Sequence, residues 1–485
     1  MKKLYRFSAI ALLVLPLVFT SCSDYLDRDD DDNITEADVF ARYEKVNGLV
    51  SDVYAAAKKA DRPLVFFEHF SNSAITDECE GTNVEGNITN NFNNGAWNPN
   101  SLPGSVGQYW EALYEGIRKA NLIIENVQKY NTPDNPQQDG DLRNRIGEMY
   151  FMRGYFHMLL LRMYGEAPYI DRVINAGDNM DFKKESVHSM VEKIVTDAQT
   201  AYGMVPNKYV KTSENFGRVD KGACLGLISF VRWVAATPLW NGASQYGYNL
   251  RRVFENEYAY DATRWRKAKE AAKAVLDFEV GGTKRYSLYT KHDANDFKDP
   301  ADGNLNDSRV YARLWDMFYD MDAFANEYVF FMTKSKDQAW QGDIYPPSRE
   351  GSSRQQPVQE QVDEYEYIVG DYGYPVYSAE ARKGGYDDTN PYVKGTRDPR
   401  FYRDVIYHGA PYRNNKNESK TINTASGSDK IGATNATTTG YYLRKFQQES
   451  WNKSGNFSIN APAIWRLPEF IYIYAEACNE LGEDI

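Results

Sequence analysis

Residues 106–170 carry the clearest hydrophobic pattern in the chain. Apolar side chains recur there at steps of three and four, which predicts two antiparallel helices that each present one apolar stripe. The first stripe is Trp110, Leu113, Tyr114, Ile117, Ala120, Ile124 and Val127. The second repeats the spacing through Ile146, Met149, Tyr150, Arg153, Phe156, Leu159, Leu160 and Met163. Pro133, Pro136 and Gly140 predict the turn between them, and Gly165 with Pro168 predicts the end of the second helix. One pair cannot bury both stripes, so further pairs should stack against it.

The same spacing predicts further helices on both sides of this pair. A capping box at Thr35 opens one that continues to Ala57, and others follow at 186–201, 222–237 and 264–278. The helix at 222–237 is apolar nearly all round, which predicts deep burial. A last helix begins at Pro468. Because the spacing of these helices is only roughly that of a tetratricopeptide array, we expect a mainly α fold, an irregular tetratricopeptide-type scaffold of helical hairpins.

The character of the chain changes after residue 280. Short strand-like runs at 328–331 and 366–369 alternate there with loops dense in Gly, Pro, Asn and Tyr. Residues 411–440 are rich in Ser, Thr, Asn and Gly, which favours a mobile segment. We therefore divide the chain into a helical region, 34–280, and a loop-rich α/β region, 281–485, that ends in a scaffold helix.

The amino terminus has the pattern of a secretory signal. Residues 1–21 place Lys2, Lys3 and Arg6 before a short apolar run, and small residues precede Cys22 as in a bacterial lipobox. We expect Cys22 to be lipidated, for example by palmitate. The alternative is an ordinary signal peptide followed by a chance cysteine.

An acidic segment follows, at residues 22–33. Its density of charge predicts an extended tether between the lipid and the folded part. A calcium loop is the alternative, but the segment lacks the alternating ligands, the glycine and the distal glutamate of such a loop.

Composition narrows the choice of partner. Aromatic residues make up 14% of the chain, with 37 Tyr and 9 Trp, and such a surplus is typical of surfaces that grip a partner. The net charge is −12 without a Lys/Arg-rich run, which argues against nucleic acid.

No motif of a catalytic, nucleotide-binding or metal site is present. The chain lacks H-E-x-x-H, G-x-S-x-G, P-loop and G-x-G-x-x-G sequences, and its five histidines are scattered without ligand spacing. His157 is interpreted as a satisfied buried residue. Cys79, Cys224 and Cys478 lack the spacing of a disulfide framework, and the last two lie in apolar helical patterns that favour buried thiols. We expect a protein that is not an enzyme and needs no cofactor or metal.

Several short motifs, in order along the chain, resemble the SusD/RagB family of Bacteroidetes outer-membrane nutrient-binding lipoproteins. They are Cys22 followed by residues 24–27, residues 109–114 with Ala120-Asn121, residues 153–156 through 164–168, residues 236–242, Asp398-Pro399-Arg400, and residues 466–469 with 474–477. Each motif alone is weak, but their order and spacing make the set specific.

The resemblance implies a surface-exposed, lipid-anchored protein of the cell outer membrane. Such a protein caps a SusC-like TonB-dependent transporter and delivers a ligand to it, usually a glycan, for nutrient uptake and polysaccharide utilization. The family normally continues past the helix at 474–477, which implies a C-terminal truncation here. Two alternatives keep the same architecture: a peptide-binding uptake protein, and a scaffold that binds only the transporter.

Sugar binding requires flat rings for the C–H faces and polar groups for the hydroxyls. The ligand-binding candidates are loop aromatics with their neighbours: Trp97 with Asn98, Trp315 with Tyr319, and Trp340 with Tyr345. Trp97 and Asn98 fit best, since they lie in an amide-rich loop ahead of the helix that contains residue 109. The resemblance implies a ligand contact for this loop, because the corresponding loop contacts ligand in some starch-binding relatives. The alternative for Trp97 is an anchor that holds the loop to the core.

Overall fold

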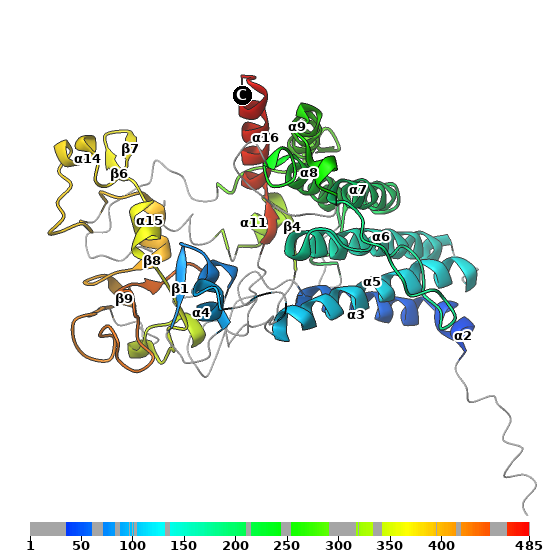
Figure 1. Cartoon of the computed structure of the whole chain (residues 1–485), viewed down its shortest axis with the longest axis horizontal. Helices are drawn as coiled ribbons and strands as arrows, with labels where there is room; N and C mark the ends of the chain where they lie inside the picture. The colour runs from blue at the N-terminus through cyan, green and yellow to red at the C-terminus, as the bar shows by residue number, and fades with distance from the viewer. Residues whose placement is uncertain are drawn as a thin grey trace, which may run out of the picture.

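The computed structural model describes residues 35–60, 71–82, 88–96, 98, 100, 104–130, 136–209, 215–243, 254–290, 317–318, 320–332, 342–393, 395–413, 419–446 and 463–484. Figure 1 shows a stack of long helices on one side and a region of short elements and loops on the other, with α16, α11 and β4 between them. The mainly α class expected from the sequence is confirmed.

The scaffold is built from helices that pack in the order of the chain. They are α2 (Glu36–Phe40), α3 (Tyr43–Ala60), α5 (Gly104–Tyr130), α6 (Pro136–Tyr164), α7 (Val187–Met204), α8 (Lys221–Ala236), α9 (Ala262–Leu276) and α16 (Leu467–Leu481). Each of α5 to α9 contacts the next, and α16 packs on α9 and α8. The tetratricopeptide-type arrangement follows from these successive contacts.

The predicted pair of helices at 106–170 is confirmed as α5 and α6. Their stripes lie in the main hydrophobic core, where Leu113, Ile117 and Phe156 are all at most 1% exposed. Gly165 ends the second helix at a φ of +70°, and a Cβ there would lie 2.8 Å from the ring of Trp240. This position therefore needs glycine for both its backbone conformation and its space.

The first predicted helix is broken in two. The side chain of Thr35 accepts a hydrogen bond from the Asp38 N–H at 3.2 Å, and Asp38 Oδ2 accepts one from the Thr35 N–H at 3.0 Å, which is the predicted capping box. The helix that it starts, α2, ends at Phe40, and α3 begins at Tyr43. The apolar spacing continues across the break, which is why the sequence predicted one helix.

The loop-rich region consists of short helices and two-stranded antiparallel pairs. The helices are η4 (Asn72–Ile75), α4 (Ile88–Asn93), α11 (Met321–Asn326), η9 (Pro347–Arg349), α13 (Gln359–Asp363), α14 (Ala379–Lys383) and α15 (Pro399–Asp404). The pairs are β1 (Cys79–Gly81) with β5 (Gln355–Pro357), β4 (Tyr328–Phe331) with β12 (Ala463–Arg466), β6 (Tyr367–Val369) with β7 (Tyr372–Tyr374), β8 (Val405–Ile406) with β11 (Tyr442–Leu443), and β9 (Pro411–Arg413) with β10 (Ser419–Thr421). Between α8 and α11 lie η6 (Glu255–Tyr258) and the pair β2 (Glu279–Val280) with β3 (Thr283–Lys284).

Two elements cross the sequence division at residue 280. Strand β1 pairs with β5, with Cys79 opposite Pro357 and Gly81 opposite Gln355, so residues 71–82 belong in space to the loop-rich region. Helix α16, which follows the loop-rich region in the chain, packs on the scaffold helices α9 and α8. The two regions are therefore joined by exchanged segments as well as by the linear chain.

Several side chains within residues 421–440 are buried, although the composition of the stretch favoured mobility. Ile422, Ala436 and Thr437 are each at most 2% exposed. The hydroxyl of Thr437 accepts hydrogen bonds from the N–H groups of Thr439 and Gly440, both at 3.1 Å. Threonine hydroxyls thus satisfy the backbone locally, which the polar composition alone does not reveal.

The cysteine predictions are confirmed. Cys224 and Cys478 are free and buried, as is Cys79. Within the described ranges, none of the helices has both the length and the apolar content that a membrane crossing requires.

Candidate functional site

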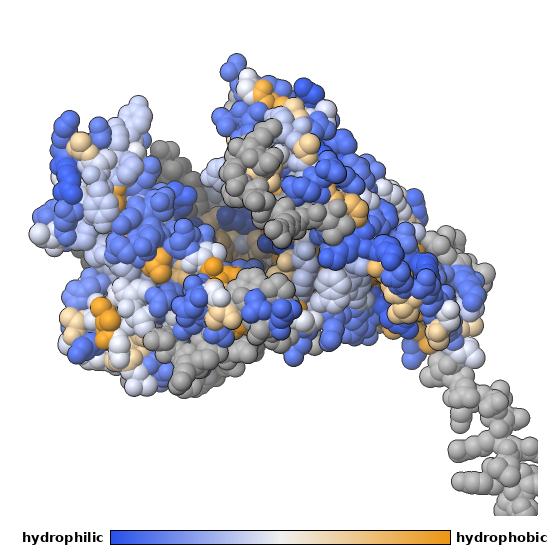
Figure 2. All heavy atoms as spheres, viewed as in Figure 1, coloured by the Kyte–Doolittle hydropathy of each residue, from blue (hydrophilic) through white to orange (hydrophobic). Residues whose placement is uncertain are grey.

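A polar pocket of about 370 Å³ opens where residues 71–79 meet the loop-rich region. Its wall takes side chains from η4, β1, β5, α13, α15, β8 and the stretch after β11. The β1–β5 pair brings the first of these segments to the others. Figure 2 shows that this view of the molecule is hollowed between the side that carries α14 and α15 and the side that carries α16.

Part of the pocket wall is fixed by internal hydrogen bonds. Gln355 Oε1 accepts from both the N–H and the hydroxyl of Ser71 at 2.9 Å. Asp404 Oδ2 accepts from Arg403 Nη2 at 2.6 Å and from the Tyr365 hydroxyl at 3.0 Å. Burial, together with this carboxylate, raises the pKa of Tyr365, so the phenol stays protonated and donates. These groups shape the pocket but are already occupied.

Four other side chains of the wall carry polar groups that are available. They are the hydroxyl of Ser73, the carboxylate of Glu78, the amide of Gln361 and the ammonium of Lys445. Within the described part of the chain, none of these four groups makes a hydrogen bond or an ion pair. Burial lowers the pKa of Lys445; the carboxylate of Asp404 opposes this shift, and the guanidinium of Arg403 adds to it.

Phe446 gives the pocket an aromatic wall. Its backbone has a φ of +65°, a left-handed conformation that costs a residue with a side chain of this size about 1–3 kcal/mol. Its ring packs edge-on against Phe318 with 4.5 Å between the centroids. The guanidiniums of Arg403 and Arg466 lie 5.3 and 5.6 Å from the Phe318 ring. The surrounding packing thus holds a strained residue at the pocket.

The sequence-predicted ligand residues have different outcomes. Asn98 is exposed, and its side-chain oxygen accepts a hydrogen bond from the Asn100 N–H at 2.9 Å. Tyr345 is 0% exposed in a core with Ile406, Ala410, Ile422 and Tyr442, so its ring cannot stack on a ligand at the surface. Trp97, Trp315, Tyr319 and Trp340 lie outside the described residues, as does Cys22.

The pocket residues were missed by sequence reasoning. Ser73, Glu78, Gln361 and Lys445 come from separate polar stretches without a shared spacing. The nearest signal was the Asp398-Pro399-Arg400 motif, whose arginine lines the pocket and whose aspartate caps α15.

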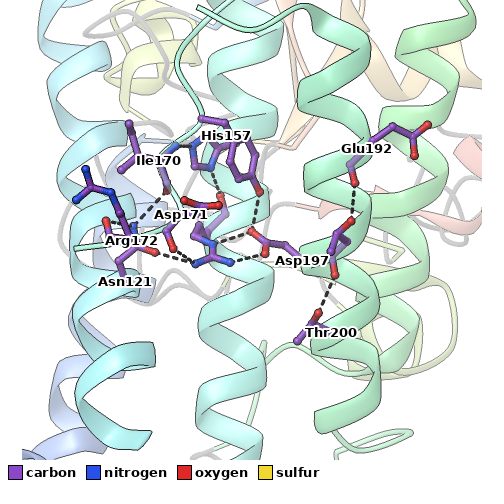
Figure 3. Close-up of polar contacts among 11 residues, drawn as sticks. Asn121, His157, Ile170, Asp171, Arg172, Glu192, Asp197 and Thr200 are labelled. Carbon is purple, nitrogen blue, oxygen red and sulfur yellow. Dashed lines mark hydrogen bonds and ion pairs between the residues drawn. The ribbon is translucent and has the colours of Figure 1, made fainter. Parts of the chain in front are cut away.

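A second polar cluster is buried in the scaffold (Figure 3). Arg153 donates from Nε and Nη2 to Asp197 at 2.8 and 2.5 Å, and from Nη1 to Asn121 Oδ1 at 2.9 Å and to the Asp171 carbonyl at 2.8 Å. The Tyr169 hydroxyl donates to Asp197 at 2.6 Å. The cluster ties the segment after α6 to α5, α6 and α7.

His157 completes this cluster in its neutral form. Its Nε2 accepts from the Ile170 N–H at 3.0 Å, so its Nδ1 donates to the Arg153 carbonyl at 2.8 Å. Burial lowers the pKa of His157 to about 3. The ring is 0% exposed and both nitrogens are bonded to the backbone, so the cluster fastens the helices and offers no group to a substrate. The interpretation of His157 as a satisfied buried residue is confirmed.

The buried His157 is expected to weaken the fold in acid. In the unfolded chain the His157 imidazole is protonated below about pH 6.5, whereas in the folded protein it stays neutral down to about pH 3. As the pH is lowered through this window, the free energy of unfolding should therefore decrease, by up to about 1.4 kcal/mol per pH unit. Urea denaturation at several pH values measures this slope. His157→Gln should reduce it, but His188, whose pKa burial lowers to about 4, keeps part of it. An unchanged slope in the variant would contradict the assignment.

The fold and pocket define a class of protein: a helical-repeat scaffold that carries a loop-rich region with a polar pocket. A family model described as starch-binding and associating with the outer membrane matches residues 24–231, and the model of the SusD family matches residues 241–484. The chain therefore belongs to the SusD/RagB family, and the resemblance of its motifs is confirmed.

Relatives with a name or a solved structure agree with this assignment. SusD-like protein P2 of Formosa agariphila is 24% identical over 202 residues, which are 41% of this chain and only 38% of that relative's length. A SusD-like protein of Bacteroides fragilis is 18% identical with a TM-score of 0.68, covering 93% of this chain and 77% of that one. A laminarin-binding SusD-like protein is 15% identical with a TM-score of 0.53, covering 90% and 80%. At these identities the solved structures show the shared fold.

Proposed function

We propose that this protein is a non-catalytic, glycan-binding lipoprotein of the cell surface that passes oligosaccharide to a SusC-like TonB-dependent transporter. The observation that carries the proposal is the pocket, where four unoccupied polar groups lie on the same wall as the ring of Phe446. Sugar hydroxyls need such donors and acceptors, and pyranose C–H faces need an aromatic neighbour. The solved relative that binds laminarin supports a glycan as the ligand class.

The loop with Trp97 and Asn98 extends this binding surface in our proposal. It follows α4, which packs against η4 and β1, and both of those elements line the pocket. Asn98 is exposed on this loop. Trp315, Tyr319 and Trp340 remain candidates for the same surface.

Attachment to the outer membrane is proposed to occur through a lipid on Cys22, with the acidic residues 22–33 as the tether. Family membership supports this location and the transporter as partner. The alternatives are a peptide ligand on the same scaffold and a protein that contacts only the transporter.

Affinity electrophoresis on a panel of polysaccharides tests the glycan proposal. At least one polysaccharide should retard the full-length protein, and Trp97→Ala should lose most of that retardation because a stacked ring contributes about 1 kcal/mol or more. The matched control is Tyr372→Ala, an aromatic that is 69% exposed on β7, away from α4 in Figure 1.

One result would overturn the glycan proposal, and another would remove Trp97 from it. A protein that no polysaccharide retards, but that binds peptides in the same gel, would be a peptide-uptake protein. Retardation that survives Trp97→Ala unchanged would leave the glycan function in place and remove Trp97 from the site.

A further inference from the structure

We infer that the pocket recognises an acidic sugar, with Lys445 as the counterion for the carboxylate of a uronic acid unit. This inference rests on the proposed glycan-binding function and specifies its ligand class. It is carried by the placement of charges in the pocket wall.

Three cations line the pocket, and two of them are already paired. Arg400 donates to its neighbour Asp398 through Nη2 at 2.6 Å and Nε at 3.0 Å. Arg403 donates to Asp404 through Nη2 at 2.6 Å. Lys445 is the third, and no carboxylate of the described residues lies within ion-pair distance of its ammonium. Burying a charge without a counterion costs free energy, so an anionic ligand should gain more binding free energy beside this lysine than beside an exposed one.

The groups around Lys445 favour an incoming anion. The carboxylates of Asp404 and Glu78 both attract the ammonium. The Asp404 carboxylate is held by Arg403 and by the Tyr365 hydroxyl, and the Glu78 carboxylate makes no ion pair with Lys445. The guanidiniums of Arg403 and Arg466 both act to lower the pKa of Lys445. A ligand carboxylate beside the ammonium would offset that repulsion and raise the pKa again. The positive charge is therefore left for the ligand to neutralise.

The remaining groups suit the hydroxyls and the ring of the same sugar. The amide of Gln361 both donates and accepts, and the hydroxyl of Ser73 does the same. The carboxylate of Glu78 can accept a hydrogen bond from a sugar hydroxyl, and it repels another carboxylate. Glu78 directly precedes β1 and is exposed. Phe446, held at its positive φ by the packing around it, places an aromatic ring beside the Lys445 ammonium, which lies 5.3 Å from the ring centroid.

Isothermal titration with matched oligosaccharides tests the inference. The probes are oligomers of galacturonate, glucuronate and mannuronate, each compared with its own carboxyl-reduced, neutral form. The full-length protein should bind at least one acidic oligomer about tenfold more tightly than its reduced form, and this preference should shrink as salt is raised. Lys445→Gln should abolish the preference, so that the acidic oligomer and its reduced form bind with equal affinity.

Two further variants sharpen the result. Glu78→Gln should increase the preference for the acidic form about threefold, because it removes a like charge from the wall. Lys430→Gln, at an exposed lysine of the same region, should leave the preference unchanged.

The outcomes separate the inference from the function on which it rests. Equal affinity for acidic and reduced oligomers, or a preference that persists in Lys445→Gln, overturns the acidic-sugar inference while glycan binding stands. Absence of binding to every glycan overturns both. A thermal unfolding curve of Lys445→Gln that matches the wild type shows that any loss arises at the site.

Discussion

Arg153→Ala is expected to lower the free energy of unfolding by about 3–5 kcal/mol, as is usual when one partner of a buried ion pair is removed. The substitution leaves the Asp197 carboxylate buried with only the Tyr169 hydroxyl as a partner among the groups of the cluster. It also releases the Asp171 carbonyl and the Asn121 amide oxygen. Urea denaturation followed by circular dichroism measures the loss.

Arg172→Ala is the matched control, because it removes an arginine from the same segment. Its pair with Asp178, at 2.6 Å, is exposed to solvent, so the change should stay below about 1 kcal/mol. Arg153→Ala combined with Asp197→Ala should cost less than the sum of the single changes, since the double variant has no orphaned charge. Equal effects of Arg153→Ala and Arg172→Ala would show that the cluster does not fasten the helices.

Gly351→Ala is expected to destabilise the loop-rich region by about 3 kcal/mol, at the upper end of the range for overpacking. A Cβ at this position would lie 2.0 Å from the carbonyl oxygen of Tyr345 and 2.3 Å from its carbonyl carbon. The backbone cannot easily move aside, because Tyr345 O accepts from the Ser353 N–H at 3.2 Å and Pro346 O accepts from the Gly351 N–H at 3.1 Å. Thermal unfolding, combined with limited proteolysis of the loops, measures the effect.

Gly342→Ala provides the comparison within the same stretch. A Cβ at Gly342 meets nothing within 4 Å, so this variant should stay within about 0.5 kcal/mol of the wild type. If the two alanine variants unfold at the same temperature, the tight turn between Tyr345 and Gly351 does not contribute as described.

The scaffold could be predicted because the apolar spacing within each helix is visible in a short stretch of sequence. The stripe with Leu113 and Ile117 on the first helix and the stripe with Phe156 on the second are each a pattern of neighbours along the chain, and burial of each stripe is its direct physical consequence. Arg153 was part of the spacing of the second stripe, but the pattern does not identify its buried partner Asp197, which lies on the next helix.

The pocket could not be predicted in the same way. Glu78 and Lys445 share a wall only because β1 pairs with β5 and β8 pairs with β11, and neither pairing follows from a local pattern. Composition was also misleading for Tyr345, where an aromatic in a polar loop suggested an exposed ring. The structure instead packs that ring in a small core which the loops themselves build.

The pairing of β4 with β12 has a consequence for how such a protein can be re-engineered. The chain leaves the scaffold after Phe331 and returns at Ala463, opposite each other in adjacent strands, so residues 332–462 are topologically one replaceable cassette. A cassette from another member could be grafted at these strands without disturbing the order of the helices. Grafting the cassette alone would not transfer the ligand specificity, because the pocket residues Ser73 and Glu78 precede α5 and lie outside the cassette. A transplant of ligand preference therefore requires two grafts, of residues 71–98 and of the cassette.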